Sequence, residues 1–224
     1  MSLEKWQAVD RYITDLLLPS DNALDEALRA SDAAGLPTIN VSPPQGRLLM
    51  ILGRTVGARK ILEIGTLGGY STIWLARSLN PGGRLITLEI DPRHAGVAAS
   101  NIARADLENM VDLRIGRALD ILPKIAEEEW SRGGFDLIFI DADKESNSEY
   151  FAWALRLSHL GTVIVVDNVV RNGAVIEESS SDSRVQGVRR FNEALAAESR
   201  VIATEIQTVG SKGYDGFAIA VVVS

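Results

Sequence analysis

The fold of this chain is decided by residues 61–71, ILEIGTLGGYS, where an apolar run leads directly into a glycine-rich turn. A helix is expected from about Tyr70, and the next apolar run ends at Glu89. Glycines let the backbone pass close to a ligand, and the first N–H groups of a helix point at any negative group that lies there. Residues 61–91 therefore predict one half of a nucleotide-binding pocket.

The spacing of the glycines distinguishes between two classes of nucleotide. The G-x-G-x-x-G turn typical of NAD-binding proteins would need glycine at positions 67 and 70, where this chain has Leu67 and Tyr70. A carboxylate at the end of the second strand, here Glu89, can accept both hydroxyl groups of a ribose. The pattern therefore disfavours an NAD-dependent oxidoreductase, which stays as an alternative, and favours a ligand with a ribose but no pyrophosphate.

The turn also resembles a known motif. The pattern Glu63-x-Gly65-x-x-x-Gly69 is similar to the first motif of methyltransferases that use S-adenosylmethionine (SAM), a ligand with a ribose and an amino-acid end. The alternative is a plain strand-to-helix corner. In that interpretation Glu63 caps nearby amides and Glu89 is a solvated acid at a strand end.

Two further apolar runs end in side chains that carry oxygen. They are residues 135–144, FDLIFIDADK, and residues 162–168, TVIVVDN. Both predict buried parallel strands, and ligands of open parallel sheets lie outside the carboxyl ends of the strands. We therefore expect Asp141, Asp167 and Asn168 to converge near the glycine turn.

These three side chains predict a site for a hard cation. Two carboxylates and one amide oxygen suit Mg²⁺, Mn²⁺ or Ca²⁺, with Mg²⁺ favoured, and the absence of cysteine from the sequence disfavours zinc. For any one of the three, the alternative is a cap on the turn or helix that follows its strand.

From about residue 42 to residue 223 the chain resembles the cation-dependent class I O-methyltransferases, the family of catechol and caffeoyl-CoA O-methyltransferases. The resemblance is carried by LEIGTLGGYST at 62–72, IDADK at 140–144 and VDNVVRNG at 166–173. It implies an α/β, Rossmann-like SAM methyltransferase fold. The expected sheet has seven mostly parallel strands, the last one antiparallel, with helices on both faces.

The resemblance also assigns roles to residues that match the family motifs. It makes Lys144 the catalytic base. The metal ligands it implies are Asp141, Asp167 and Asn168. The cofactor-binding residues it implies are Glu63, Gly65, Gly69, Ser71, Glu89, Ala118, Asp141 and Asp143. One departure is Arg171, which stands where the plant caffeoyl-CoA enzymes have tryptophan.

The chemistry of methyl transfer agrees with these roles. SAM offers an electrophilic methyl group, and a phenolate attacks it far better than a neutral phenol. A divalent cation that binds two adjacent oxygens lowers their pKa and fixes the acceptor in line with the S–CH₃ bond. Lys144 can then take the proton. The alternative for Lys144 is a surface lysine or a simple ion pair with Asp143.

Composition limits the class of protein and its partners. The 224 residues are 46% apolar and 24% charged, which predicts one methyltransferase domain over 1–224, with a helical cover at 1–41 and a Rossmann-like core at 42–224. No apolar run approaches a membrane span or a signal segment, so a cytoplasmic protein without a membrane partner is expected. The net charge of −7 disfavours nucleic acid. The expected partner is a small catechol-like acceptor.

The two ends of the chain predict further elements. Helical spacing indicates amphipathic helices over the first forty residues, which in the resembled family cover the active site and contribute to a homodimer. Ser42, Pro43 and Gln45 match the N-cap, N1 and N3 positions of a third helix. Residues 210–213 predict the turn of a final hairpin, facing the acceptor side.

Other residues have mainly structural interpretations. His94 and His159 are predicted to cap helices or lie on the surface. Residues 177–183 predict a loop on the ligand side, which either folds over the acceptor or leads to a helix. The choice of acceptor is expected to depend on loops around Asn40, Arg171 and Tyr214. A non-catalytic, dimeric SAM-binding module remains the main alternative to an enzyme.

Overall fold

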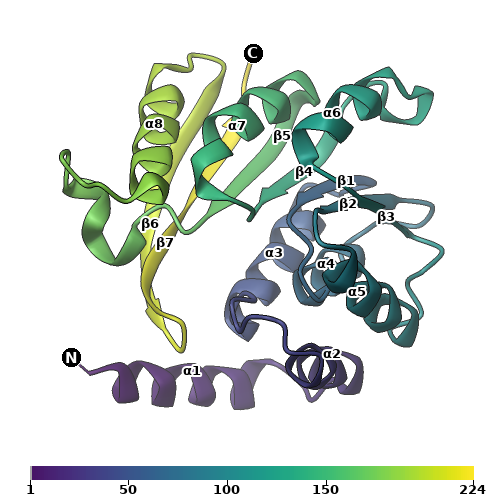
Figure 1. Ribbon diagram of the computed structural model, residues 1–224. Coiled ribbons are helices and arrows are strands. Elements are labelled where there is room, and N and C mark those ends of the chain that lie inside the picture. Colours follow the sequence, from purple (N-terminus) through teal and green to yellow (C-terminus); the bar gives the residue numbers. More distant parts are fainter. Residues whose placement is uncertain (1) are drawn as a thin grey trace.

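The computed structural model describes residues 2–224, and a seven-stranded sheet forms its centre (Figure 1). The strands are β1 (Lys60–Ile64), β2 (Arg84–Glu89), β3 (Val111–Ile115), β4 (Phe135–Ile140), β5 (Ser158–Asp167), β6 (Val201–Gly210) and β7 (Gly213–Val222). Their order across the sheet is β3-β2-β1-β4-β5-β7-β6. β7 runs antiparallel to both of its neighbours, β5 and β6, and the other paired strands are parallel, so the predicted fold class is confirmed.

Helices lie on both faces of the sheet. The α-helices are α1 (Leu3–Leu17), α2 (Asn22–Ala33), α3 (Pro43–Thr55), α4 (Tyr70–Ala76), α5 (Pro92–Arg104), α6 (Ala118–Glu127), α7 (Asn147–Arg156) and α8 (Ser183–Ala197). The 3-10 helices are η1 (Glu129–Ser131), η2 (Lys144–Ser146) and η3 (Arg171–Ile176). None of the helices formed by residues 2–224 is long and apolar enough to cross a membrane.

The two helical layers follow from the alternation of side chains along each strand. On β1, Leu62 and Ile64 pack in a core shared with α6, α7 and α8, whereas Ile61 packs in a second core with α3, α4 and α5. Because both faces are buried, the central strands have apolar side chains on both sides. This explains why they appear in the sequence as continuous apolar runs.

The predicted start of α3 is confirmed in detail. The Ser42 hydroxyl accepts the N–H of Gln45, and the Gln45 side chain accepts the N–H of Ser42, with Pro43 in the first turn. This capping box satisfies two N–H groups that would otherwise have no partner. The cap fixes where the segment between α2 and α3 joins the sheet.

The strand order creates the crevice that holds the site. From the centre, β2 and β3 follow β1 on one side, while β5 follows β4 on the other. The order in which strands are added to the sheet therefore reverses between the parallel strands β1 and β4. Ligands of such sheets bind at this switch point, outside the carboxyl ends of the strands. Gly65 follows β1 and Asp141 follows β4, which brings the glycine turn and the first predicted cation ligand together.

One glycine contact in the helical layer gives a test of the packing. A Cβ on Gly187 in α8 would lie 2.2 Å from the carbonyl oxygen of Lys144, whereas a Cβ on Gly96 in α5 would meet nothing within 4 Å. We expect Gly187→Ala to lower the free energy of unfolding by about 1–3 kcal/mol through this overlap. Gly96→Ala should raise it by about 0.5–1 kcal/mol, because alanine favours the helix. Urea denaturation measures both, and equal effects would contradict this packing.

Candidate functional site

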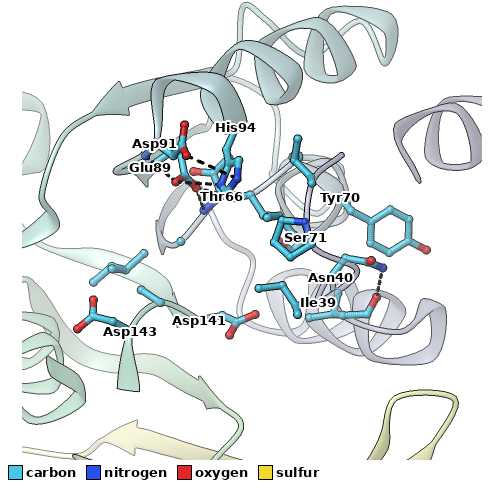
Figure 2. Close-up of a pocket in the computed structure, with 18 of the residues that line it drawn as sticks. Ile39, Asn40, Thr66, Tyr70, Ser71, Glu89, Asp91, His94, Asp141 and Asp143 are labelled. Carbon is cyan, nitrogen blue, oxygen red and sulfur yellow. Dashed lines mark hydrogen bonds and ion pairs between the residues drawn. The ribbon is translucent and has the colours of Figure 1, made fainter. Parts of the chain in front are cut away.

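A cavity of about 1280 Å³ lies at the carboxyl ends of β1, β2 and β4 (Figure 2). Its wall is formed by the glycine turn, the ends of β2 and β4, the start of α6 and the segment 36–41 between α2 and α3. Of the predicted cofactor residues, those on its wall are Gly65, Ser71, Glu89, Ala118, Asp141 and Asp143. The structure therefore brings most of that predicted set to one cavity.

Glu89 shapes the turn that faces the cavity. Its Oε2 accepts the N–H of Leu67 at 2.7 Å and that of Thr66 at 3.3 Å, and its Oε1 accepts the N–H of Asp91 at 2.9 Å. A carboxylate has about four acceptor positions, so one remains for a ligand hydroxyl. Glu89 thus connects the glycine turn to the end of β2.

The interpretation of His94 as a capping or surface residue is wrong. His94 lines the cavity, with Nδ1 3.6 Å from Glu89 Oε1 and Nε2 3.8 Å from Asp91 Oδ2. Figure 2 shows these three residues grouped with Thr66 on one side of the cavity. The signal that could have found His94 is its place in the first turn of the helix that follows the Glu89 strand.

Glu63 and Gly69, predicted to bind the cofactor, do not line the cavity. Glu63 is fully buried and accepts three hydroxyl groups, from Ser71 at 2.6 Å, Thr72 at 2.5 Å and Thr87 at 2.7 Å. Burial raises the pKa of Glu63 to about 7, although these hydrogen bonds oppose the shift. Glu63 therefore acts through Ser71, which does line the cavity.

Gly69 is required by the corner between the turn and α4, which explains why it does not line the cavity. Gly69 has a φ of 82° and precedes the first residue of α4. This left-handed conformation suits glycine, which turns the chain into the helix. Gly69 thus serves the corner, and Gly65, Gly68 and Ser71 form the surface around it.

Lys144 is buried at the end of β4 and pairs with Asp141. Its Nζ lies 2.8 Å from Asp141 Oδ1, so the alternative pairing with Asp143 is wrong. Asp143 instead accepts the hydroxyl of Tyr150 at 2.5 Å. Tyr150 lies on α7 and was missed by sequence reasoning, because nothing in its local pattern distinguishes it from a core tyrosine.

Asp167 and Asn168 lie at the end of β5, beside a second cavity of about 390 Å³. Asp167 Oδ1 accepts the N–H of Asn168 at 2.8 Å, and Asn168 has a φ of 61°. Burial, followed by the negative charge of Asp141, raises the pKa of Asp167 to about 7. Asn168 lines both cavities, so the three predicted cation ligands lie around the boundary between them.

The predicted cation ligands keep oxygens available. In the described part of the chain, the side-chain hydrogen bonds of Asp141 and Asp167 use only their Oδ1 atoms, and the Asn168 amide oxygen takes part in none. No group of three His, Asp or Glu side chains within residues 2–224 is placed to hold a metal ion. A cation site here therefore depends on the amide of Asn168 as the third protein ligand.

The loops predicted to affect the acceptor behave differently. Asn40 and Arg171 line both cavities, but Tyr214 lines neither and donates its hydroxyl to Gln207. The predicted hairpin turn lies at the wall of both cavities, where Ser211 and Lys212 contribute to the lining. Residues 177–183 line neither cavity.

His159 agrees with its predicted surface position. It is partly exposed, and its Nε2 lies 3.0 Å from Asp136 Oδ1. Asp136 is the second residue of β4, whereas Asp141 follows the last residue of that strand, at its other end. His159 is therefore separate from the cavities.

Comparison with known proteins gives a consistent result. A family model described as O-methyltransferase matches residues 19–218. A catechol O-methyltransferase from Niastella koreensis is 54% identical over 222 residues, covering 99% of this chain and 100% of the relative. The family model spans strands β1 to β6 and the first part of β7, and the relative is aligned over nearly the whole chain.

Two solved structures are also similar. An O-methyltransferase from Bacillus cereus in complex with SAH is 58% identical, with a TM-score of 0.96 and coverage of 99% of this chain and 100% of that one. TomG from Streptomyces achromogenes, an O-methyltransferase involved in tomaymycin synthesis, is solved in complex with SAM. It is 52% identical, with a TM-score of 0.95 and full coverage of both chains.

The buried carboxyl of Glu63 predicts a pH dependence of stability. Its pKa is about 7 in the folded chain and 4.5 ordinarily, so between these values the folded state holds a proton that the unfolded state has lost. Stability from this group is full below pH 4.5 and is lost as the pH rises through 7. Relative to wild type, Glu63→Gln should gain roughly 3 kcal/mol between about pH 5 and about pH 8.

Urea denaturation at both pH values measures this change. Glu193→Gln, at an exposed position on α8, is the matched control. A difference between Glu63→Gln and wild type that stays constant across this range would contradict the account of Glu63.

Proposed function

Because the chain belongs to the O-methyltransferase family and is a SAM-dependent O-methyltransferase, we propose that it uses a divalent cation to methylate a hydroxyl of a small catechol-like acceptor. The observation that carries the proposal is the grouping of Asp141, Asp167 and Asn168, each with an unused oxygen, beside the buried Lys144. A non-catalytic binding module would not need this combination. Membership of the family also disfavours an NAD-dependent oxidoreductase.

The proposed SAM site is the large cavity. Glu89 has acceptor capacity for the ribose, and Ser71 with the turn at Gly65 faces the methionine end. Ala118 and Asp143 complete the wall. In this proposal Glu63 orients Ser71 through their hydrogen bond. All seven strands belong to one sheet, which supports the prediction of a single methyltransferase domain.

The proposed cation site fits the donor chemistry of the residues present. Asp141 and Asp167 each offer Oδ2, and Asn168 offers its amide oxygen, a set that suits Mg²⁺ and also Mn²⁺ or Ca²⁺. When bound, such a cation lowers the pKa of an adjacent acceptor hydroxyl and orients it. The positive φ of Asn168 turns its side chain out of the strand direction at the wall of both cavities.

The chain's own residues supply the remaining chemistry. Lys144 Nζ, as the neutral amine, is proposed to receive the proton of the acceptor hydroxyl and become the ammonium, since it is buried and lines the cavity three residues after Asp141. The oxygen then forms a bond to the SAM methyl carbon as the S–CH₃ bond breaks, and the sulfur keeps that electron pair. The segment 36–41 and the hairpin turn close the acceptor side and exclude water.

We also propose that the protein is a homodimer. α1 has no buried residue, and its exposed apolar side chains are Leu3, Val9, Tyr12, Leu16 and Leu17. On β6, Ile202 and Ile206 are exposed and share a sheet face with Val221 and Phe217 through the strand register. Figure 1 shows α1 beside the turn end of the β6–β7 hairpin, and Ile202 lies toward the other end of β6. Apolar areas of this kind mark protein interfaces.

Sedimentation equilibrium tests the dimer. Wild type should sediment as a dimer, and Leu16→Glu together with Ile202→Glu should give a monomer, because a charge would be buried without a partner. Lys124→Gln, at an exposed position on α6, is the control. A monomeric wild type would contradict the proposal.

Metal removal tests the main proposal. Methyl transfer from SAM to caffeic acid and other catechols should require Mg²⁺ or Mn²⁺, stop with EDTA and return when metal is restored. Asp141→Ala should abolish transfer while the variant stays folded. Product formed in EDTA, or by Asp141→Ala at the wild-type rate, would remove the metal mechanism while leaving a SAM-dependent enzyme.

The base is tested separately. Lys144→Ala should lower turnover about 10²–10⁴-fold, the usual contribution of a general base, while the Kd for SAM changes little. Single-turnover kinetics and calorimetric titration measure the two quantities. Unchanged turnover at saturating acceptor would dismiss Lys144 from this role.

A further inference from the structure

The turn between β6 and β7 brings a lysine without a counter-ion to the wall of both cavities. Lys212 Nζ donates to the carbonyl oxygen of Thr38 at 3.1 Å and lies 3.4 Å from Asn40 Oδ1. Both acceptors are neutral, and Lys212 forms no salt bridge with any residue in the part of the chain described by the structure. A cation is thus held at the cavity by two uncharged oxygens.

The carboxylates near this turn are engaged elsewhere. Asp10 Oδ2, from α1, accepts the N–H of Ser211 at 2.6 Å and so fixes the turn. Asp215 Oδ1 accepts the N–H groups of Val170 at 3.0 Å and Arg171 at 2.9 Å. Asp167 is a proposed cation ligand. The acids that line the small cavity therefore serve the backbone or the cation, and Lys212 is left with its charge.

A second cation at the same wall is also incompletely paired. Arg171 lines both cavities, its Nε is buried without a hydrogen-bond partner, and its Nη1 lies 3.8 Å from Asp215 Oδ2. Asn168, a proposed cation ligand, borders the same two cavities. An acceptor whose diol lies at the cation therefore has its remaining atoms within the cavity that Lys212 and Arg171 share.

Lys212 is an exposed residue of the turn, so its ammonium is open to a ligand at the cavity wall. The pKa of the Lys212 ammonium is lowered from its usual range, because the side chain is partly removed from water. A cation without a counter-ion at the wall of a cavity attracts an opposite charge that enters the cavity. This favours an anion over a neutral or cationic group at the wall.

We propose that Lys212, assisted by Arg171, forms a subsite that selects acceptors carrying a carboxylate on the part of the molecule away from the diol. The inference rests on the proposed function, since it assumes that the diol lies at Asp141, Asp167 and Asn168. It narrows the acceptor from catechols in general to catechols with an acidic arm. Lys212 is a specificity-determining residue in this account and takes no part in the proton transfer.

The test is a series of acceptors of similar size that share the diol and differ in the charge of the group on the other side of the ring. The acid 3,4-dihydroxybenzoate, its neutral methyl ester and the cationic 3,4-dihydroxybenzylamine are compared by kcat/KM, with caffeate and methyl caffeate as a longer pair. Wild type should prefer acid over ester, and ester over amine. Lys212→Gln should lower the ratio of kcat/KM for acid over ester by about tenfold, the effect of one charged hydrogen bond.

Two further variants separate charge from structure. Lys212→Arg should keep the preference for acids, because it keeps the charge. Lys124→Gln removes the same charge from an exposed position outside both cavities and should leave every ratio unchanged. Displacement of the turn would lower kcat/KM for acid and ester alike, so it would leave their ratio unchanged.

The outcomes are distinguishable. If the esters are methylated but wild type shows no preference for acids, or Lys212→Gln retains that preference, the subsite is wrong and the proposed function stands. If no catechol in the series is methylated with metal present, the proposed function fails and the subsite fails with it.

Discussion

The contact on which the site depends is that between the backbones of Gly65 and Asp141. The Asp141 N–H donates to the carbonyl of Ile64 at 2.8 Å, and a Cβ on Gly65 would lie 2.1 Å from the Asp141 carbonyl oxygen. Because Gly65 also has a φ of 101°, no other residue fits without moving one of the two segments. The contact joins the end of β1, which carries the cofactor turn, to the end of β4, which carries Asp141 and Lys144.

Buried acids then determine the electrostatics of this edge of the sheet. Glu63 lies behind the turn, and Asp167 is the last residue of β5. The charge of Asp141 contributes to the raised pKa of both groups, after the larger effect of burial. Glu63 is stabilised by three hydroxyl groups, whereas Asp141 has Lys144. The concentration of negative charge between β4 and β5 is a physical reason for the proposed cation there. The two neutral partners of Lys212 are the corresponding reason for the proposed anion at the turn between β6 and β7.

Much of the fold could be predicted from the sequence, because short local patterns determine the strands and the helix starts. Continuous apolar runs identified the buried strands, and the Ser42 capping box identified a helix start. Other features depend on neighbours that are distant in sequence. Glu63 serves Ser71 because Thr87 lies opposite it in the register and α4 covers it. Lys212 depends on a contact with Thr38, and no local pattern indicates that pairing.

The central claim is that Asp141, Asp167 and Asn168 hold a divalent cation. Its most direct test is the binding of Mn²⁺ in the presence of SAM, measured by electron paramagnetic resonance. Wild type should bind a single Mn²⁺ per chain, and Asp167→Asn should weaken binding at least about tenfold by removing a charged ligand. Asp120→Asn, at an exposed position on α6, should bind as wild type does. Equal affinity of wild type and Asp167→Asn, or no binding by wild type, would contradict the account.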